Sequence, residues 1–237
     1  MTFKKLRSII GIESDNTGHA EKAISIIGGF IGIFLILWIS AQYAGLHGVA
    51  LLIASMGSSA VLVFAVPHST FAQPWPLVSS HFICTLIGVF CAQTVANPYI
   101  AAPLSVALSI AAMSYLRCIH PPAGGTALVP VIGGPDVHAL GYQFAFTPVL
   151  LNIGILLLAA IFVNYAFQWR RYPAYFSKVA DHSELPSSAS SNTLQHDDFV
   201  FAINEMGSYV DITDEDMAKI YALAVKHAQK NRRKQPL

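Results

Sequence analysis

The placement of charged side chains constrains the fold of this chain more than any other feature. Between Ala23 and Trp169 the sequence carries two formal charges, Arg117 and Asp136, whereas the first 22 and the last 68 residues carry the other 25. Soluble domains contain roughly 25% charged residues, but this chain contains 11%, with 54% apolar residues. A water-exposed surface needs more charge than this. The middle of the chain is therefore predicted to lie in a lipid bilayer.

Uncharged stretches of about 20 residues can cross the roughly 30 Å hydrocarbon layer as helices. Four stretches predict full spans: 24–43, 77–96, 99–116 and 144–169. Two further stretches are ambiguous, because 48–66 has a Gly-Ser-Ser run in its middle and 117–134 contains three prolines. The predicted fold is an all-α polytopic membrane helical bundle with six spans, or with four spans plus two re-entrant segments.

Basic residues on the flanks of the bundle predict its topology. They are Lys4, Lys5, Arg7, Lys22, Arg170, Arg171 and Lys178. By the positive-inside rule both termini are cytoplasmic, and we expect a bacterial inner membrane. The number of crossings is then even, so the two ambiguous stretches either both cross or both do not.

The domain organisation follows the same charge pattern. The predicted parts are a cytoplasmic N-terminal segment (1–22), a transmembrane domain (23–170), a linker (171–196) and a small cytoplasmic helical appendage (197–237). Thr213 and Asp216 resemble a capping box at the start of the last helix. The appendage is interpreted as a passive tail, or as a regulatory or dimer-forming element, which would make the protein a homo-oligomer.

The two ambiguous stretches resemble each other. Residues 57–63 (Gly-Ser-Ser-Ala-Val-Leu-Val) can be aligned with residues 124–130 (Gly-Gly-Thr-Ala-Leu-Val-Pro). The chain then divides into two three-element units, 24–96 and 99–169, which is the pattern of a 3+3 inverted repeat in transporters. The alternative is that small residues recur because they allow close packing of membrane helices.

The second of these stretches contains the strongest local motif. Pro121 and Pro122 suit the first turn of a helix, and the glycines and Thr126 that follow would expose donors at a helix N-terminus. Such an end attracts anions. The run from Gly57 to Ser59 would offer the same in the first unit, so the two interrupted helices predict a pocket for a small anion. The alternative is a tightly packed helix break.

Two side chains near this motif allow more than one interpretation. Arg117 could hold the anion or line its entry path, or it could snorkel to the interface. His120 could bind the anion when protonated, carry a coupled proton, or cap a backbone carbonyl. His68 and His81 are weaker candidates, which we interpret as interfacial.

Several functions are excluded by what the sequence lacks. Cys84, Cys91 and Cys118 have no metal-ligand spacing, so neither a metal nor a cofactor is expected. No catalytic motif is present, so the protein is predicted not to be an enzyme. The net charge of +1 without a basic stripe argues against a nucleic-acid partner.

The motif around His120-Pro121-Pro122, continuing as Ala-Gly-Gly-Thr-Ala-Leu, resembles the signature of the HPP family of integral membrane proteins. The block that begins at Gly57, with Gln73-Pro74 after it, is similar to a second block of that family. The resemblance covers about residues 20–170. It implies four or more spans and, because some plant-chloroplast and cyanobacterial members are linked to nitrite transport, an anion substrate.

The leading hypothesis is therefore membrane transport of a small inorganic anion, with nitrite as the first candidate and the lipid bilayer as its surroundings. The residues predicted to bind the anion are Gly57, Ser58, Ser59, Arg117, His120, Gly124, Gly125 and Thr126. The alternative is a non-transporting scaffold or sensor that signals through residues 181–237. An intramembrane enzyme with His120 as its base ranks last, because the motif contains no nucleophile or carboxylate.

Overall fold

A computed structural model of the protein describes residue 10 and residues 17–40 and 46–176. The helices are α2 (His19–Ser40), α3 (Leu46–Ala65), α4 (Pro74–Thr94), α5 (Pro98–Tyr115), α6 (Pro122–Ile132), α7 (Pro135–Leu140) and α8 (Leu151–Tyr165). One wide helical turn, η2 (Ala145–Leu150), precedes α8. The described ranges contain no strand, which confirms the all-α prediction. The predicted appendage, 197–237, lies outside the described residues.

Four helical segments are long and apolar enough to cross a membrane. They are His19–Ser40, Pro74–Thr94, Pro98–Tyr115 and Ala145–Tyr165, and they correspond to the four spans predicted from the sequence. The two ambiguous stretches contain shorter apolar helices, Leu52–Ala65 within α3 and the whole of α6.

Prolines mark where several of these helices begin. Pro74 opens α4 and Pro98 opens α5, where the side chain of Asn97 also accepts a hydrogen bond from the backbone N–H of Tyr99 at 3.0 Å. Pro122 opens α6. A proline in the first turn sacrifices no helical hydrogen bond and has its φ angle already set.

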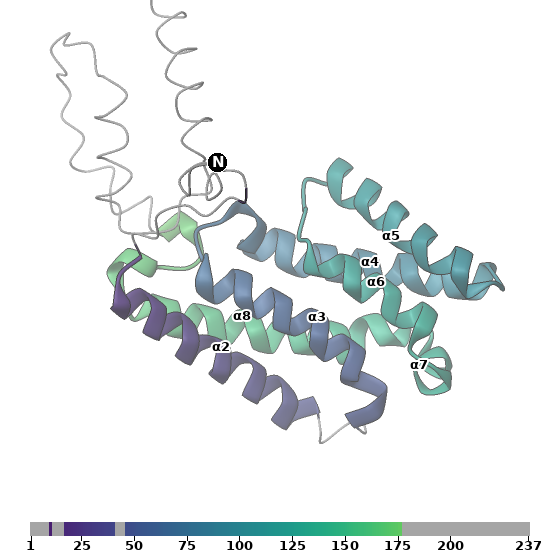
Figure 1. The fold of residues 1–237 in the computed structure, drawn as a ribbon, viewed down its shortest axis with the longest axis horizontal. Coiled ribbons are helices and arrows are strands. Elements are labelled where there is room, and N and C mark those ends of the chain that lie inside the picture. The colour runs from purple at the N-terminus through teal and green to yellow at the C-terminus, as the bar shows by residue number, and fades with distance from the viewer. Residues whose placement is uncertain (1–9, 11–16, 41–45, 177–237) are drawn as a thin grey trace, which may run out of the picture. The chain divides into compact units, whose positions relative to one another are not determined.

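Close contacts at glycines bring several helices together; Figure 1 shows how these helices are arranged. On α2, a Cβ added to Gly28 would lie 2.4 Å from the ring of Phe64 on α3, and one added to Gly32 would lie 3.1 Å from Leu156 on α8. Elsewhere α5 packs against α4 and α6. Between α4 and α6, a Cβ on Gly88 would lie 2.3 Å from the carbonyl oxygen of Ala127. Small residues allow such approaches between membrane helices.

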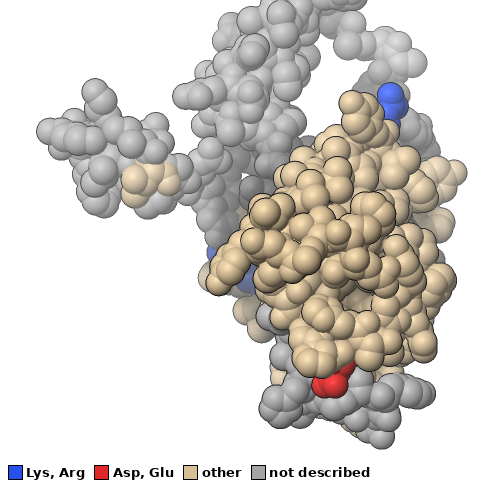
Figure 2. All heavy atoms as spheres, turned by 90° about the vertical axis from the view of Figure 1, so that its right-hand side faces the viewer, with Lys and Arg blue, Asp and Glu red and all other residues tan. Residues whose placement is uncertain are grey.

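One end of the bundle gathers segments that are far apart in the sequence: the start of α2, the loop between α3 and α4, the turn after α5 and the segment after α8. The contacts that join them are Glu21–Arg170, Gln73–Ala174 and Trp75–Leu116. The opposite end carries α7. Figure 2 shows that end, whose described surface is almost entirely uncharged, with a carboxylate at its lower edge.

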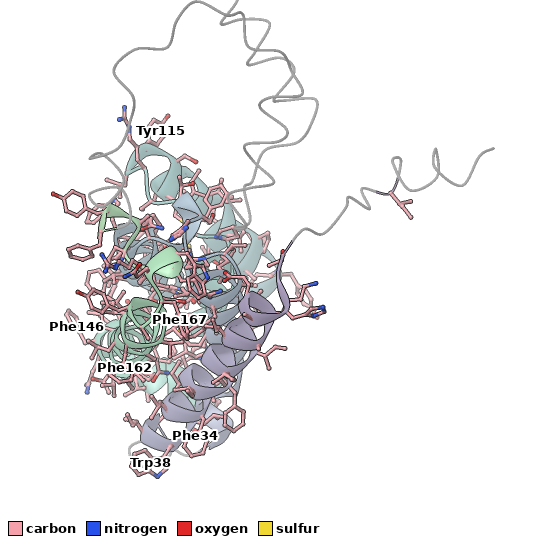
Figure 3. The ribbon with its side chains drawn as sticks, turned by 90° about the vertical axis from the view of Figure 1, so that its left-hand side faces the viewer. Phe34, Trp38, Tyr115, Phe146, Phe162 and Phe167 are labelled. Carbon is pink, nitrogen blue, oxygen red and sulfur yellow. The ribbon has the colours of Figure 1, made fainter. Side chains whose placement is uncertain are left out.

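Large apolar side chains cover the outside of the bundle. Figure 3 shows Phe34, Trp38, Phe146 and Phe162 pointing away from it, and all four are exposed. Exposed apolar surface on this scale is unusual in a soluble monomer. It is the surface that a lipid-facing helix presents.

Candidate functional site

A cluster of buried polar side chains lies where α3, α4 and α6 meet. We call it the histidine–hydroxyl chain; it consists of Ser55, Ser59, His81, His120 and Thr126. Four of its members are completely buried, and Ser55 is 6% exposed. Buried polar groups in an apolar bundle are costly unless they are hydrogen-bonded, and here each contacts at least two partners.

Ser59 lies at the centre of the chain. Its hydroxyl oxygen is 2.9 Å from Nε2 of His81, on α4, and 2.9 Å from Nε2 of His120, in the segment before α6. The two imidazole rings are tilted by 58°, with their centroids 5.0 Å apart. One serine hydroxyl therefore bridges two histidines from different parts of the sequence.

The second half of the chain runs from His81 to the start of α6. Nδ1 of His81 is 2.7 Å from the Thr126 hydroxyl, which is 2.7 Å from the Ser55 hydroxyl. Ser55 in turn lies 2.7 Å from the carbonyl oxygen of Pro122, to which it can donate. This half ties α3, α4 and α6 together.

The first half ends at the loop between α3 and α4. Nδ1 of His120 lies 2.7 Å from the carbonyl oxygen of Phe71. The side-chain amide of Gln73 holds this loop by donating to the carbonyls of Pro67 and Ser69, each at 2.9 Å. His120 therefore caps a carbonyl, which was one of its predicted roles, while its second ring nitrogen faces Ser59.

Two titratable side chains hold the same loop from outside the spans. The buried Tyr172 hydroxyl donates to the carbonyl of Ala72 at 2.7 Å, and burial raises the pKa of Tyr172, so it stays neutral. His68 lies 3.3 Å from the carbonyl of Arg171. Burial lowers the pKa of His68, and the Arg171 carbonyl opposes that shift.

The structure brings together only some of the predicted site residues. Ser59, His120 and Thr126 belong to the histidine–hydroxyl chain. Gly57, Ser58, Gly124 and Gly125 do not, since Ser58 and Gly125 are exposed and a Cβ at Gly57 or Gly124 would contact nothing within 4 Å. Arg117 is exposed in the turn after α5, with a positive φ of 53°.

The predicted interruption of the first unit is wrong. Helix α3 is continuous through Gly57–Ser59, so these residues lie inside a helix and present no free helix N-terminus. The prediction for α6 holds, because that helix begins at Pro122. The N–H groups of Ala123 and Gly124 are nevertheless bonded to the carbonyls of His120 and Pro121, so this end offers fewer free donors than the motif suggested.

Two members of the chain were missed from the sequence. His81 was interpreted as interfacial, yet it is fully buried and joins both halves of the chain. Ser55 was not singled out, although it lies four residues before Ser59 and so shares its helix face. A signal for His81 was available, because Ser80 and Thr85 make its part of α4 unusually polar for a span.

A second buried polar cluster surrounds Arg170, which is 1% exposed. Its guanidinium forms an ion pair with Glu21 and donates to the carbonyl of Phe64, at the end of α3, and to Asn164 at 3.1 Å. Trp169 donates to the same carboxylate at 3.0 Å. This cluster fastens the start of α2 to the ends of α3 and α8.

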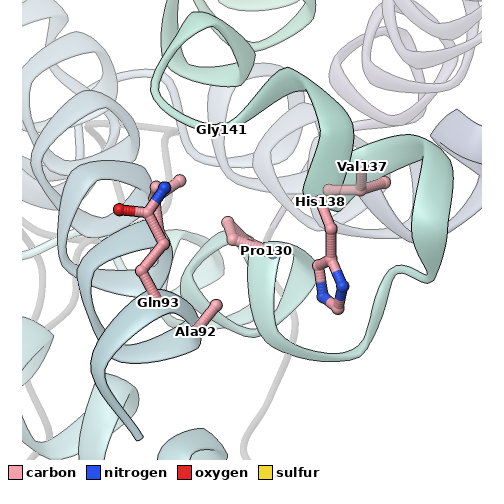
Figure 4. Close-up of a pocket in the computed structure, with 7 residues that line it drawn as sticks. Ala92, Gln93, Pro130, Val137, His138 and Gly141 are labelled. Atoms are coloured by element: carbon pink, nitrogen blue, oxygen red, sulfur yellow. The ribbon is translucent and has the colours of Figure 1, made fainter. Parts of the chain in front are cut away.

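A cavity of about 160 Å³ lies near the end of α6 that faces α7 (Figure 4). Its lining residues are Val89, Ala92, Gln93, Pro130, Val137, His138 and Gly141. Gln93 and His138 supply its polar side chains, and His138 lies 3.3 Å from the carbonyl of Val131. The cavity and the histidine–hydroxyl chain therefore lie near opposite ends of α6.

Apolar helices of spanning length, an apolar outer surface and a buried polar cluster define an integral membrane protein. The family described as "HPP, transmembrane region" matches residues 14–173, and the chain belongs to that family.

Two Dictyostelium discoideum proteins named as transmembrane proteins are similar to this chain. One is 37% identical over 154 residues, covering 63% of this chain and 54% of its own length; the other is 33% identical over 156 residues, covering 64% and 50%. The chain thus spans about half the length of these relatives. No solved structure matches it.

Proposed function

We propose that this protein transports a small inorganic anion across the membrane and is not an enzyme. The observation that supports this most is the histidine–hydroxyl chain, a group of hydroxyls and imidazoles buried among the apolar helices. Among the described residues, Glu21, which is paired with Arg170, and Asp136, on α7, are the carboxylates. Neither contacts the chain. A site with donors and no carboxylate suits an anion better than a cation.

The anion would pass along α6. This helix has 11 residues, and at about 1.5 Å per residue it spans only about half of the hydrocarbon layer. The histidine–hydroxyl chain lies at its start and the 160 Å³ cavity near its other end. Interrupted helices with polar groups at the break are where transporters bind substrate. Nitrite is the first anion to test, because the family resemblance points to it.

We also propose six crossings arranged as a 3+3 inverted repeat, in which α2, α3 and α4 correspond to α5, α6 and α8. Successive helices run in alternating directions in Figure 1. The contacts support the correspondence in part, because α5 packs on α4 and α6, and α2 approaches the corresponding helices α8 and α3 at Gly28 and Gly32, although less closely. The contacts of α3 with α8 and of α4 with α6 form a matching pair.

The proposed orientation places the end that contains the start of α2 in the cytoplasm. The basic residues of the described bundle are at this end: Lys22, Arg117, Arg170 and Arg171. Asp136 lies on α7, at the opposite end. An excess of Lys and Arg on one side marks the cytoplasmic side of a bacterial inner membrane.

Purified full-length protein in liposomes tests the proposal. Nitrite uptake should exceed that of empty liposomes, and Gly125→Leu, at the start of α6, should reduce it by about tenfold or more, since a misplaced contact in a binding site has effects of this size. Gly29→Leu is the matched control, because a Cβ at Gly29 would contact nothing within 4 Å.

Two outcomes would contradict the transport proposal. Protein-containing liposomes that take up nitrite, nitrate and chloride no faster than empty ones would overturn it. The scaffold alternative would instead gain support if deletion of 181–237 abolished a cellular phenotype that Gly125→Leu leaves intact.

A further inference from the structure

The histidine–hydroxyl chain has a definite proton requirement, because a backbone carbonyl ends it on each side. The carbonyls of Phe71 and Pro122 can only accept hydrogen bonds, so the groups next to them, His120 and Ser55, must both donate outward. Full hydrogen bonding therefore requires the chain to donate a proton to a carbonyl at each end.

Between these carbonyls the chain holds fewer protons than contacts. It contains six contacts, joining Phe71, His120, Ser59, His81, Thr126, Ser55 and Pro122 in that order. When both imidazoles are neutral, each of the five side chains has one proton to donate. One contact of 2.7–2.9 Å is then left without a hydrogen.

When both imidazoles are neutral and His120 donates to Phe71, the contact without a hydrogen is the last one, between Ser55 and Pro122. His120 donates from Nδ1, so its Nε2 accepts from Ser59, and Ser59 accepts from Nε2 of His81. Nδ1 of His81 then accepts from Thr126, which accepts from Ser55. The single proton of Ser55 is now used, and the carbonyl of Pro122, 2.7 Å away, receives none.

One added proton completes all six of these contacts. With His120 doubly protonated, Nε2–H donates to Ser59, Ser59 donates to His81, and each later group donates onward to Pro122. With His81 doubly protonated, Ser59 donates instead to His120. The two forms interconvert when the Nε2–H bond of His120 breaks, Ser59 gains that proton and gives its own to Nε2 of His81, so no proton is created or lost.

Ser59 has one further contact outside these six. The carbonyl of Ser55 lies 3.1 Å from the Ser59 hydroxyl. If Ser59 donates there, both imidazoles must donate to Ser59 from Nε2. His120 then carries protons on both nitrogens, because it already donates to Phe71. This arrangement also requires an imidazolium, and filling all seven contacts takes two protons more than the neutral chain holds.

The surroundings contain no fixed charge to balance that imidazolium. The titratable side chains within three residues of the two histidines are the thiols of Cys84, on α4, and Cys118, before α6, and the exposed Arg117. The two thiols belong to one buried cluster. On α3, α6 and the 66–73 loop, the titratable side chains are His47, in the first turn of α3, and His68, at the loop's outer side. A buried uncompensated charge is strongly disfavoured, so the added proton needs an anion beside it.

We propose that the histidine–hydroxyl chain is a proton-binding site that takes up one proton together with the transported anion, which makes this protein a proton-coupled anion carrier. The inference depends on the proposed function. Linkage makes the coupling reciprocal: the bound anion strengthens proton binding, and the proton strengthens anion binding. Ser59 then acts as the bridge that shares the proton between His120 and His81.

Calorimetry on the full-length wild-type protein in detergent tests the inference directly. Sodium nitrite, which is ionised at neutral pH, is titrated in two buffers that differ in ionisation enthalpy. The buffer dependence should report about one proton taken up for each anion bound. In ¹⁵N-histidine spectra, nitrite should move the signals of His81 and His120 toward the imidazolium position.

Liposomes test whether the coupling depends on Ser59. With an internal pH dye and subtraction of the signal from protein-free liposomes, an inward nitrite gradient should acidify the interior. Ser59→Ala should lower the number of protons per anion by about tenfold or more. Ser79→Ala is the matched control, because Ser79 lies outside the histidine–hydroxyl chain, is partly exposed, and donates to the Trp75 carbonyl of its own helix.

The outcomes separate the two proposals. Nitrite binding or uptake with no accompanying proton would overturn the coupling and leave anion transport standing. Absence of binding and uptake for nitrite, nitrate and chloride alike would overturn the two together. If Ser59→Ala fails to fold, the calorimetry and the spectra of the wild-type protein still decide.

Discussion

Two buried polar clusters in the bundle both connect elements that are distant in the sequence, but they use different kinds of side chain. The Arg170 cluster does so with two opposite formal charges, Arg170 and Glu21, whose remaining hydrogen-bonding groups reach Asn164, Trp169 and a carbonyl. The histidine–hydroxyl chain connects its elements with side chains that carry no permanent charge.

This difference distinguishes a cluster that only stabilises the fold from a site that can change its protonation state. We call the Arg170 cluster the structural lock. An ion pair is complete as it stands, and removing either partner leaves a buried charge. The neutral histidine–hydroxyl chain holds one proton fewer than the six contacts between Phe71 and Pro122, so it gains a hydrogen bond by binding a proton. The permanent charges of Arg170 and Glu21 therefore lie at the end of the bundle where α2 begins. The side chains that can gain a proton lie at the break before α6.

The largest expected effect is on the structural lock. Arg170→Met should lower the free energy of unfolding by about 3–5 kcal/mol, because it leaves the Glu21 carboxylate buried without its partner. Titration with a denaturing detergent in mixed micelles would measure this loss.

The double variant Glu21→Leu with Arg170→Met is the control for that measurement. It removes both charges, so most of the lost stability should return. A double variant as unstable as Arg170→Met alone would mean that Asn164 and the Phe64 carbonyl, not the ion pair, determine the stability of this end.

The next effect concerns the framework of the histidine–hydroxyl chain. Gly88→Ala should destabilise the protein by about 1–3 kcal/mol, because the new methyl group meets the backbone carbonyl of Ala127, which cannot move aside as a side chain could. Forcing α4 from α6 would also separate His81 from Thr126. Gly154→Ala, where nothing lies within 4 Å, should leave thermal stability in detergent nearly unchanged.

A smaller effect is expected within the chain itself. Thr126→Val removes the hydroxyl between His81 and Ser55 while preserving the shape of the side chain. A buried group left without its partner costs roughly 1–3 kcal/mol. Thr94→Val is the matched control, since Thr94 is exposed and donates only to the Phe90 carbonyl of its own helix. Equal losses for the two variants in the same micelle titration would mean that the chain contributes nothing to stability.

The sequence predicted those parts of the fold that depend on local composition. Four spans could be located because uncharged stretches of fixed length and prolines at helix starts are local signals. The continuity of α3 through Gly57 could not be predicted, because a glycine within a membrane helix and one at a helix break have the same sequence signature. Packing around the helix decides between them.

The sequence predicted only those members of the candidate site that lie in one local motif or in the run that resembles it. His120 and Thr126 belong to one motif, and Ser59 belongs to the run that resembles it. His81 joins them through contacts 22 and 45 residues apart along the chain, and the pairing of Glu21 with Arg170 spans 149 residues. Pairings at such distances arise from the tertiary fold, which no local pattern encodes.

The smallest expected effect concerns Arg117, which lies at the same end of the bundle as Arg170 but is exposed. Its φ of 53° is a left-handed conformation that costs an ordinary residue about 1–2 kcal/mol, and glycine adopts it freely. Arg117→Gly should therefore leave the free energy of unfolding unchanged or raise it by up to about 1 kcal/mol. A loss of unfolding free energy comparable to that of Arg170→Met would show that charge at this end stabilises the bundle whether it is buried or exposed. The distinction between the buried Arg170 cluster and the exposed Arg117 would then be wrong.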